Sequence, residues 1–269
     1  MNILTVLTKP TDNPHHYEIY WANGVQNQGL LRVSVEQSCD DLDVVAELGA
    51  LHHLLVVKSI FGSDRAGRSA HRSAQLNDTP DPAAEASDRL QLNVTSGQLR
   101  KLMQQKSKKL HLVPFALFLS TRFAGSNIVV KNDASWIKPR AHEHVEEIVV
   151  NGVLDDHLEV PGIGIASLSA HAIEQVQKRG NGLSLVEAWH QVRKIVRTCD
   201  YEYIPSSDKR KRDIDRYGFS GRTIYSTYSG WNVIVTPPSG LNRHLPVIAT
   251  LYYEKRPTTA LVRIHPQAA

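Results

Sequence analysis

A histidine at the start of a predicted helix is the side chain of this sequence best suited to proton transfer. The segment Ser167–Arg197 predicts two consecutive helices, with His171 near the beginning of the first and Arg179, followed by a glycine, at its end. Imidazole titrates near neutral pH, and a fixed cation holds phosphate oxygens. A proton carrier beside fixed cations is what cleavage or tight binding of a phosphodiester requires. The same pattern is also typical of a small α+β domain with a solvated basic face, so both interpretations stay open.

Four further residues, on the predicted strand segments that follow and in a turn between two of them, extend this candidate site. Arg222 could hold a phosphate oxygen, and Tyr225 and His244 could transfer protons or stack on a base. Trp231 lies in a predicted turn, where an exposed indole could stack on an unpaired base. Each of these residues also has an ordinary structural role, because aromatic side chains are common in half-buried strands. The fold decides whether they meet at one site.

Two basic tracts favour contact with a polyanion. The first follows a predicted helix over 98–106, and the second lies in a predicted charged loop over 206–216. Runs of like charge are usually solvated, but the presence of two such runs favours contact with a phosphate backbone. Such a contact weakens as the salt concentration rises. The candidate binding residues are Lys106, Lys108 and Lys109 in the first tract and Lys209, Arg210, Lys211 and Arg212 in the second.

The composition limits the class of protein that carries these residues. The 269 residues include 31 Lys and Arg against 27 Asp and Glu, a mild excess that permits nucleic-acid contact without requiring it. The two cysteines, Cys39 and Cys199, are far apart and support neither a disulfide framework nor a thiolate metal site. No apolar run reaches the roughly 18 residues of a membrane span, and no signal-peptide pattern is present. We therefore expect a cytoplasmic protein with no membrane contact, no cofactor and no metal.

In the first half of the chain, hydrophobic patterning predicts strands separated by helices. Strands are expected at 16–20, 30–35, 90–94, 110–119 and 127–131, and helices at about 40–58, 98–106 and 141–150. The segment 62–89 is rich in Ser, Ala, Asp and Arg and nearly lacks large apolar side chains, so we expect a mobile surface insertion. These elements predict one α/β domain over residues 1–153.

In the second half, a Gly/Pro-rich segment at 161–164 indicates a boundary. Beyond it we expect two helices over about 170–197 and strands at 222–228, 232–237, 246–254 and 260–265. A helix pair followed by a run of strands predicts a small α+β domain with an antiparallel sheet over residues 154–269.

The order of elements in the first half resembles the ribonuclease-H-like fold. Val45–Leu51 (VAELGAL) is similar to the family's first helix, which bears a catalytic glutamate, and Leu92–Leu99 (LNVTSGQL) is similar to its fourth strand running into a helix. The resemblance implies two divalent metals held by several carboxylates. Only Glu47 matches that set, because Ser96 replaces the fourth-strand aspartate and Tyr17–Gly24, taken as the first strand, contains no aspartate. With Glu47 interpreted as an edge position on an amphipathic helix, we expect a catalytically degenerate, mixed-sheet domain.

The second half resembles the small RelE/ParE-like toxin fold. The likeness depends on Ser169–Gly180 (SAHAIEQVQKRG), followed by a second helix and several strands. It implies metal-independent RNA cleavage, in which a 2′-hydroxyl attacks the adjacent phosphorus. In that reaction His171 would be the base or acid, and Arg179 and Arg222 would stabilise the phosphorane. Relatives of this fold also include inert binding modules.

Two functions are compatible with these observations. The first is a non-catalytic factor of phage or mobile-element type that binds nucleic acid, RNA more than DNA, with a host protein as a second class of partner. The alternative is a metal-independent endoribonuclease with its site in the C-terminal domain. A two-metal nuclease in the first half is disfavoured because its partner carboxylates are missing.

Overall fold

The computed structural model describes residues 2–24, 27–36, 39–61, 90–180, 182–217, 222–238, 245–254 and 261–264. The chain divides into two compact units, Met1–Leu154 and Asp155–Ala269, and both contain helices and a mixed sheet. The division lies one residue after the boundary expected from the sequence. The expected insertion over 62–89 lies outside the described residues. Among the helices described, none is both long and apolar enough to cross a membrane.

A six-stranded mixed sheet forms the frame of the first unit. Its strands are β1 (Asn2–Pro10), β2 (His16–Asn23), β3 (Asn27–Val35), β4 (Leu90–Val94), β5 (Asn127–Val130) and β6 (Val145–Val150). Across the sheet they lie in the order β5-β4-β1-β2-β3-β6. β1, β2 and β3 pair as two antiparallel hairpins, whereas the pairs β1–β4, β4–β5 and β3–β6 are parallel. Parallel pairs need long crossover connections, and helical segments occupy these connections.

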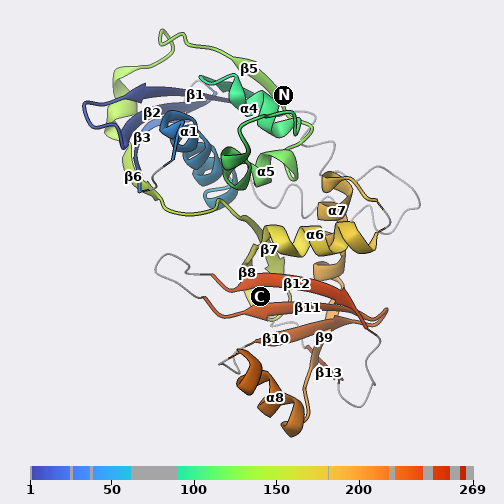
Figure 1. The fold of residues 1–269 in the computed structure, drawn as a ribbon. Helices are drawn as coiled ribbons and strands as arrows, with labels where there is room; N and C mark the ends of the chain where they lie inside the picture. Colours follow the sequence, from blue (N-terminus) through green and yellow to red (C-terminus); the bar gives the residue numbers. More distant parts are fainter. Residues whose placement is uncertain are drawn as a thin grey trace. The chain divides into compact units, whose positions relative to one another are not determined.

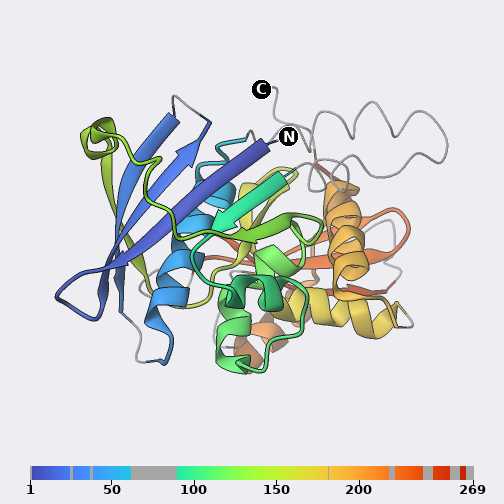
Figure 2. The same ribbon diagram turned by 90° about the horizontal axis from the view of Figure 1, so that it is seen from above.

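Helix α1 (Leu42–His52) crosses one face of this sheet (Figure 1) and is buried on nearly all sides. It contacts β1, β2, β3 and β6 and also the short helices α4 (Gln98–Met103) and η2 (Leu110–Phe115). Figure 2 shows β1–β3 as a layer beside the helix. The sheet and the short helices both cover α1, which accounts for a helix with apolar residues on every side. Gly49 allows the close approach to the sheet, because a Cβ there would lie 2.2 Å from Val150 Cγ2 on β6.

The structure corrects three expectations for the first unit. The segment 110–119, expected as a strand, forms η2 and the short helix α5 (Leu117–Ser120), because Pro114 lacks the N–H that a strand ladder needs. The segment 141–150, expected as a helix, contains the end of the 3₁₀ turn η3 (Pro139–Glu143) and the β-branched strand β6, which pairs with β3. β1 was not expected, although Leu4 and Val6 alternate into the core as strand residues do.

A seven-stranded mixed sheet with three helices forms the described part of the second unit. The strands are β7 (Asp156–Val160), β8 (Gly164–Leu168), β9 (Cys199–Tyr203), β10 (Thr223–Thr227), β11 (Trp231–Thr236), β12 (Val247–Tyr253) and β13 (Leu261–Arg263). They lie in the order β13-β9-β10-β11-β12-β8-β7, and the pair β8–β12 is parallel. The sheet is therefore mixed, not purely antiparallel as expected.

Local capping signals explain the two helices that pack together in this unit. α6 (Ala170–Arg179) begins where the Ser169 hydroxyl accepts a hydrogen bond from the Ala172 N–H, and it ends at Gly180. α7 (Leu185–Arg197) begins with a capping box between Ser184 and Glu187. Their apolar faces bury Ile173, Val176, Trp189, Val192 and Ile195, and α6 lies against β12.

Two further expectations for the second unit were wrong. The Gly/Pro segment at 161–164 is not a boundary but the turn of the β7–β8 hairpin, where Gly162 and Gly164 have φ values of 80° and 89°. The charged loop expected over 206–216 is helix α8 (Ser207–Tyr217), inserted between β9 and β10. Lysine and arginine are good helix formers, so a run of charge does not exclude a helix.

Candidate nucleic-acid interface

The first basic tract follows α4, which is fixed to the core of the first unit. Leu99, Leu102 and Met103 are buried on one side of α4. The Arg100 guanidinium donates two hydrogen bonds to the Ile128 carbonyl oxygen, at 3.1 Å from Nε and 2.7 Å from Nη2. Arg100 therefore contributes to the stability of the fold.

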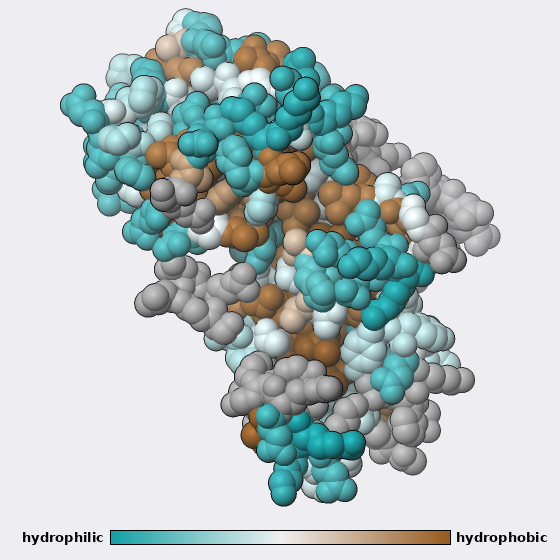
Figure 3. All heavy atoms as spheres, in the orientation of Figure 1, coloured by the Kyte–Doolittle hydropathy of each residue, from teal (hydrophilic) through white to brown (hydrophobic). Residues whose placement is uncertain are grey.

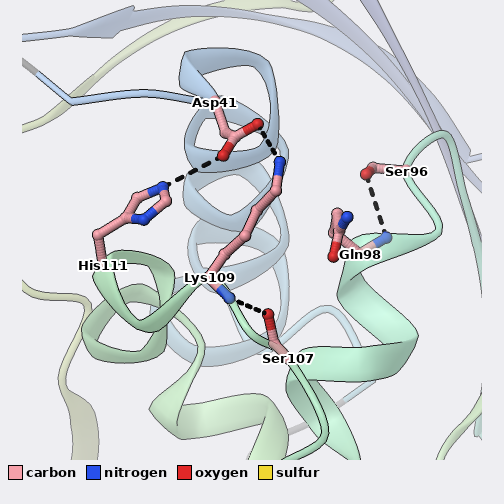
Figure 4. A network of polar contacts seen from close by, with 6 residues as sticks. All are labelled: Asp41, Ser96, Gln98, Ser107, Lys109 and His111. Atoms are coloured by element: carbon pink, nitrogen blue, oxygen red, sulfur yellow. Dashed lines mark hydrogen bonds and ion pairs between the residues drawn. The ribbon is translucent and has the colours of Figure 1, made fainter.

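The far end of the tract is tied to the start of α1 through Asp41 (Figure 4). The Asp41 carboxylate lies 2.5 Å from Lys109 Nζ and 3.2 Å from His111 Nε2. The hydrogen bond from Lys109 lowers the pKa of Asp41 below its ordinary value. The Ser107 hydroxyl accepts a hydrogen bond from the Lys109 backbone N–H at 3.1 Å. These contacts hold the tract in place and neutralise Lys109.

Three lysines of the same segment remain at the surface. Lys101, Lys106 and Lys108 are exposed, and within the described residues they form no ion pair. Figure 3 shows that hydrophilic side chains dominate this face of the first unit, with apolar patches between them. Exposed, unneutralised ammonium groups on an anchored backbone are suited to contacts with phosphate oxygens.

Glu47 lies under this segment and is fully buried, which corrects its interpretation as an edge position on the helix. It is 1% exposed, and its two carboxylate oxygens accept hydrogen bonds from the backbone N–H groups of Thr95 (2.5 Å) and Ser96 (3.0 Å). Burial raises the pKa of Glu47 to about 7, and the nearby carboxylate of Asp43 acts in the same direction. Glu47 thus joins α1 to the end of β4 and uses both oxygens to do so.

The carboxylates of the first unit do not form a metal site in the described part of the chain. The first strand of the sheet is β1, not Tyr17–Gly24, and β1 contains no Asp or Glu. Among the described residues, no three His, Cys, Asp or Glu side chains gather closely enough to hold a metal ion. The donor set here therefore does not fit two-metal chemistry.

The structure places the proposed acid–base residues of the second unit apart. His171 is exposed near the beginning of α6, and Arg179 lies eight residues later, about 12 Å along the helix axis. Arg179 Nη1 donates a hydrogen bond to the Leu251 carbonyl oxygen on β12. Tyr225 is 7% exposed on β10, two strands from β12, and burial raises the pKa of its hydroxyl.

The remaining residues of that prediction do not complete a site. Arg222 is half-buried and immediately precedes β10. His244 lies outside the described residues. Of the candidate residues that the structure describes, the proton carrier His171 therefore does not meet the guanidinium of Arg179.

The second basic tract and Trp231 lie on other parts of the second unit. The tract lies in α8, which packs extensively on no other described element and is distant from α6 and α7 (Figure 1). The Lys211 and Arg212 side chains are exposed, and those of Lys209 and Arg210 lie outside the described part of the chain. Trp231 is half-buried, with its ring centroid 5.8 Å from that of the exposed Tyr253.

Sequence reasoning missed the anchoring role of Asp41 and of His111. A signal for Asp41 was present, because two aspartates precede the apolar helix, where an acidic residue favours the helix start. No sequence signal relates residues 41 and 111, which are brought together by packing alone.

The comparisons with known proteins give no relative. The chain matches no family model, no curated protein and no solved structure. The functional interpretation therefore depends on the geometry of its own residues.

Proposed function

We propose that this chain is a nucleic-acid-binding protein that acts without cleaving its ligand, as a binding or inhibitory factor of phage or mobile-element type. The observation that carries the proposal is the exposed trio Lys101, Lys106 and Lys108 on a segment anchored at both ends. Backbone anchoring reduces the entropy lost when these side chains meet a row of phosphates. RNA is the favoured ligand, because the resemblance in the second unit concerns RNA-directed proteins. The proposal places the protein in the cytoplasm, with a host protein as a further partner.

A degenerate ribonuclease-H-like scaffold is the finer fold that we propose for the first unit. Strand β1 makes Leu90–Val94 the fourth strand, which is the position that the resemblance implies for it. The helix that bears Glu47 meets the end of that strand through Thr95 and Ser96. Both observations support the alignment with the ribonuclease-H-like fold. The carboxylate of Glu47 is buried and hydrogen-bonded at both oxygens, which supports a binding role in place of catalysis.

For the second unit we propose a RelE-like core, supported by the succession of α6, α7 and antiparallel strands β9 to β11. The added hairpin β7–β8 and helix α8 depart from the pattern expected from the sequence. The endoribonuclease alternative gains no support from the positions of His171, Arg179 and Tyr225, so a binding module is the better hypothesis here.

The salt dependence of binding tests the proposal. Fluorescence anisotropy with labelled RNA and DNA duplexes gives the slope of log K against log salt for the wild type and for the Lys101/Lys106/Lys108→Gln triple variant. Each phosphate contact contributes about 0.9 to the magnitude of this slope. The slope of the triple variant should therefore be smaller in magnitude by about 1 to 3, and the variant should bind more weakly.

A variant with the same change in net charge provides the control. Lys178, Lys194 and Arg197 are exposed cations of α6 and α7, and their replacement by Gln should leave the slope within about 0.5 of the wild-type value. An equal reduction of the slope in both triple variants would show that binding depends on net charge alone and not on the position of the lysine trio. Absence of binding to RNA and to DNA at low salt would refute the function.

A further inference from the structure

The face of the six-stranded sheet opposite α1 is only partly covered. Trp136 and Ile137 pack there against a small cluster formed by Tyr20, Leu30 and Ala141. On the same face, beyond this cluster, the ends of β1, β2 and β3 present the exposed Ile3 together with small and polar side chains. This part of the sheet was not singled out by any sequence motif.

A groove of about 310 Å³ lies beside Trp136. Ile3, Thr5 and Ala22 form its floor. Trp136, Gln28 and Lys138 form its walls, and no carboxylate lines it. The space is sufficient for one aromatic heterocycle and part of a sugar, because pockets for small ligands begin at roughly 300 Å³.

The wall that carries the cation is held in place by a buried amide. Gln28 is 4% exposed, and its Oε1 accepts a hydrogen bond from the Lys138 backbone N–H at 3.3 Å. This bond fixes the backbone of Lys138 beside the floor of the groove, while the Lys138 side chain is exposed. The groove therefore has a positioned cation at its rim.

A row of amide side chains continues from the floor across the neighbouring strands. Asn93 Nδ2 donates to Thr5 Oγ1 at 2.9 Å, Gln91 Nε2 donates to Asn93 Oδ1 at 2.8 Å, and Asn127 Nδ2 donates to Gln91 Oε1 at 3.4 Å. The row crosses from β1 to β4 and β5. Asn93 is 4% exposed and holds the row in place, whereas Gln91 is half-buried and Asn127 is exposed. An amide carries both donors and acceptors, so Gln91 and Asn127 can hydrogen-bond the edges of bases.

We infer that this groove binds an unpaired nucleobase of a single-stranded nucleic acid. Trp136 supplies the aromatic surface on which a base stacks, and Lys138 supplies the cation for the adjoining phosphate. A base within a duplex is stacked on both sides and does not reach the groove. The inference rests on the proposed function and adds a second mode of binding to the one carried by the lysine trio.

Photocrosslinking tests the stacking contact directly. A single-stranded RNA of about ten nucleotides, carrying 5-iodouridine, is irradiated with the full-length protein, and the adduct is located by mass spectrometry. We expect the adduct on Trp136. Adducts found only on other aromatic residues, such as Trp231 or Tyr253, would overturn the inference.

Affinity measurements with the same RNA add a quantitative test. Trp136→Ala should weaken binding of the single strand by about 5- to 150-fold, the usual range for losing one stacked base. Trp136→Phe should stay within about fivefold of wild type, because it keeps an aromatic ring. Ala22→Leu fills the floor without removing any contact and should also weaken the single-stranded complex. An unchanged affinity for the single strand in Trp136→Ala and Ala22→Leu would overturn the inference.

Duplex binding separates this inference from the proposed function. All three groove variants should bind duplex with wild-type affinity, which also shows that they are folded. If the affinity for duplex depends on the lysine trio but the affinity for the single strand is the same in the wild type and the groove variants, the inference fails and the proposed function stands. If the wild type binds no nucleic acid of either form, both fail.

Discussion

Replacement of Glu47 by Gln tests whether this buried carboxylate is a structural group or a metal ligand. Both of its oxygens accept backbone hydrogen bonds, from Thr95 and Ser96. Glutamine keeps one acceptor oxygen but places an NH₂ group against the other N–H, which then has no acceptor. We expect this loss to destabilise the first unit by about 1–3 kcal/mol at low pH, the usual cost of an unsatisfied buried polar group.

The raised pKa of Glu47 makes this difference depend on pH. Burial raises the pKa from 4.5 to about 7, and at about 1.36 kcal/mol per unit this corresponds to about 3 kcal/mol. Through this pH window the unfolded chain releases the Glu47 proton while the folded chain retains it. The contribution of Glu47 to the free energy of unfolding therefore falls as the pH rises from about 4.5 to about 7 and then levels off. Neutral glutamine removes this dependence.

Urea denaturation of both proteins at several pH values measures the effect. Hydrogen exchange of the peptides that span β4 assigns the transition to the first unit. From about pH 4.5 to about 7, the free energy of unfolding of the wild type should fall by about 3 kcal/mol relative to that of Glu47→Gln. The other titrating groups are common to both proteins and cancel in this difference. A difference that is independent of pH would refute the reasoning. Stabilisation of the wild type alone by Mg²⁺ would instead restore a metal-binding role for Glu47.

Three further predictions address other parts of the chain. His171→Ala should leave RNA intact and RNA affinity within about twofold of wild type in gel assays; RNA cleavage by the wild type that the variant lacks would establish the endoribonuclease. Asp41→Asn should release Lys109 and lower the unfolding free energy by about 1 kcal/mol, while the released charge makes the salt dependence of RNA binding steeper; a flatter salt dependence would contradict the neutralising contact. Gly49→Ala should destabilise the first unit by about 1–3 kcal/mol through its clash with Val150, and Gly49→Ala combined with Val150→Ala should recover part of that loss in urea denaturation; no recovery would show that the clash is not the cause.

Local signals in the sequence predicted many of the elements of the fold. The neighbouring strands β2 and β3, the amphipathic and capped helices α6 and α7, and the strands from β10 to β13 all follow from patterns within a few residues. Some expectations failed although local signals were present, as at Pro114 and in the charged helix α8, and others failed where distant partners decide the structure. β6 is a strand because β3 lies beside it in parallel, and β8 pairs with β12, some 80 residues later in the chain.

The candidate site was less predictable than the fold, because composition does not distinguish a free charge from a neutralised one. Lys106, Lys108 and Lys109 are equivalent in sequence, yet only Lys109 meets an aspartate, and that aspartate is 68 residues away. Glu47 was expected at a solvated edge because its helix was taken to have one polar face. The second layer of short helices over α1 removes that face, and periodicity within the helix itself carries no information about it.

The parallel pairing of β3 with β6 has a consequence for the order in which the chain folds during synthesis. β3 ends at Val35, but its outer neighbour is complete only when Val150 has left the ribosome. Until then the outer side of β3 presents an unpaired row of N–H and C=O groups, which is a template for association with other chains. A nascent or truncated chain that stops before Val145 keeps this edge open. The first unit is therefore open to aggregation through this edge during translation of the segment between its third and sixth strands, a period in which binding to a chaperone would protect it.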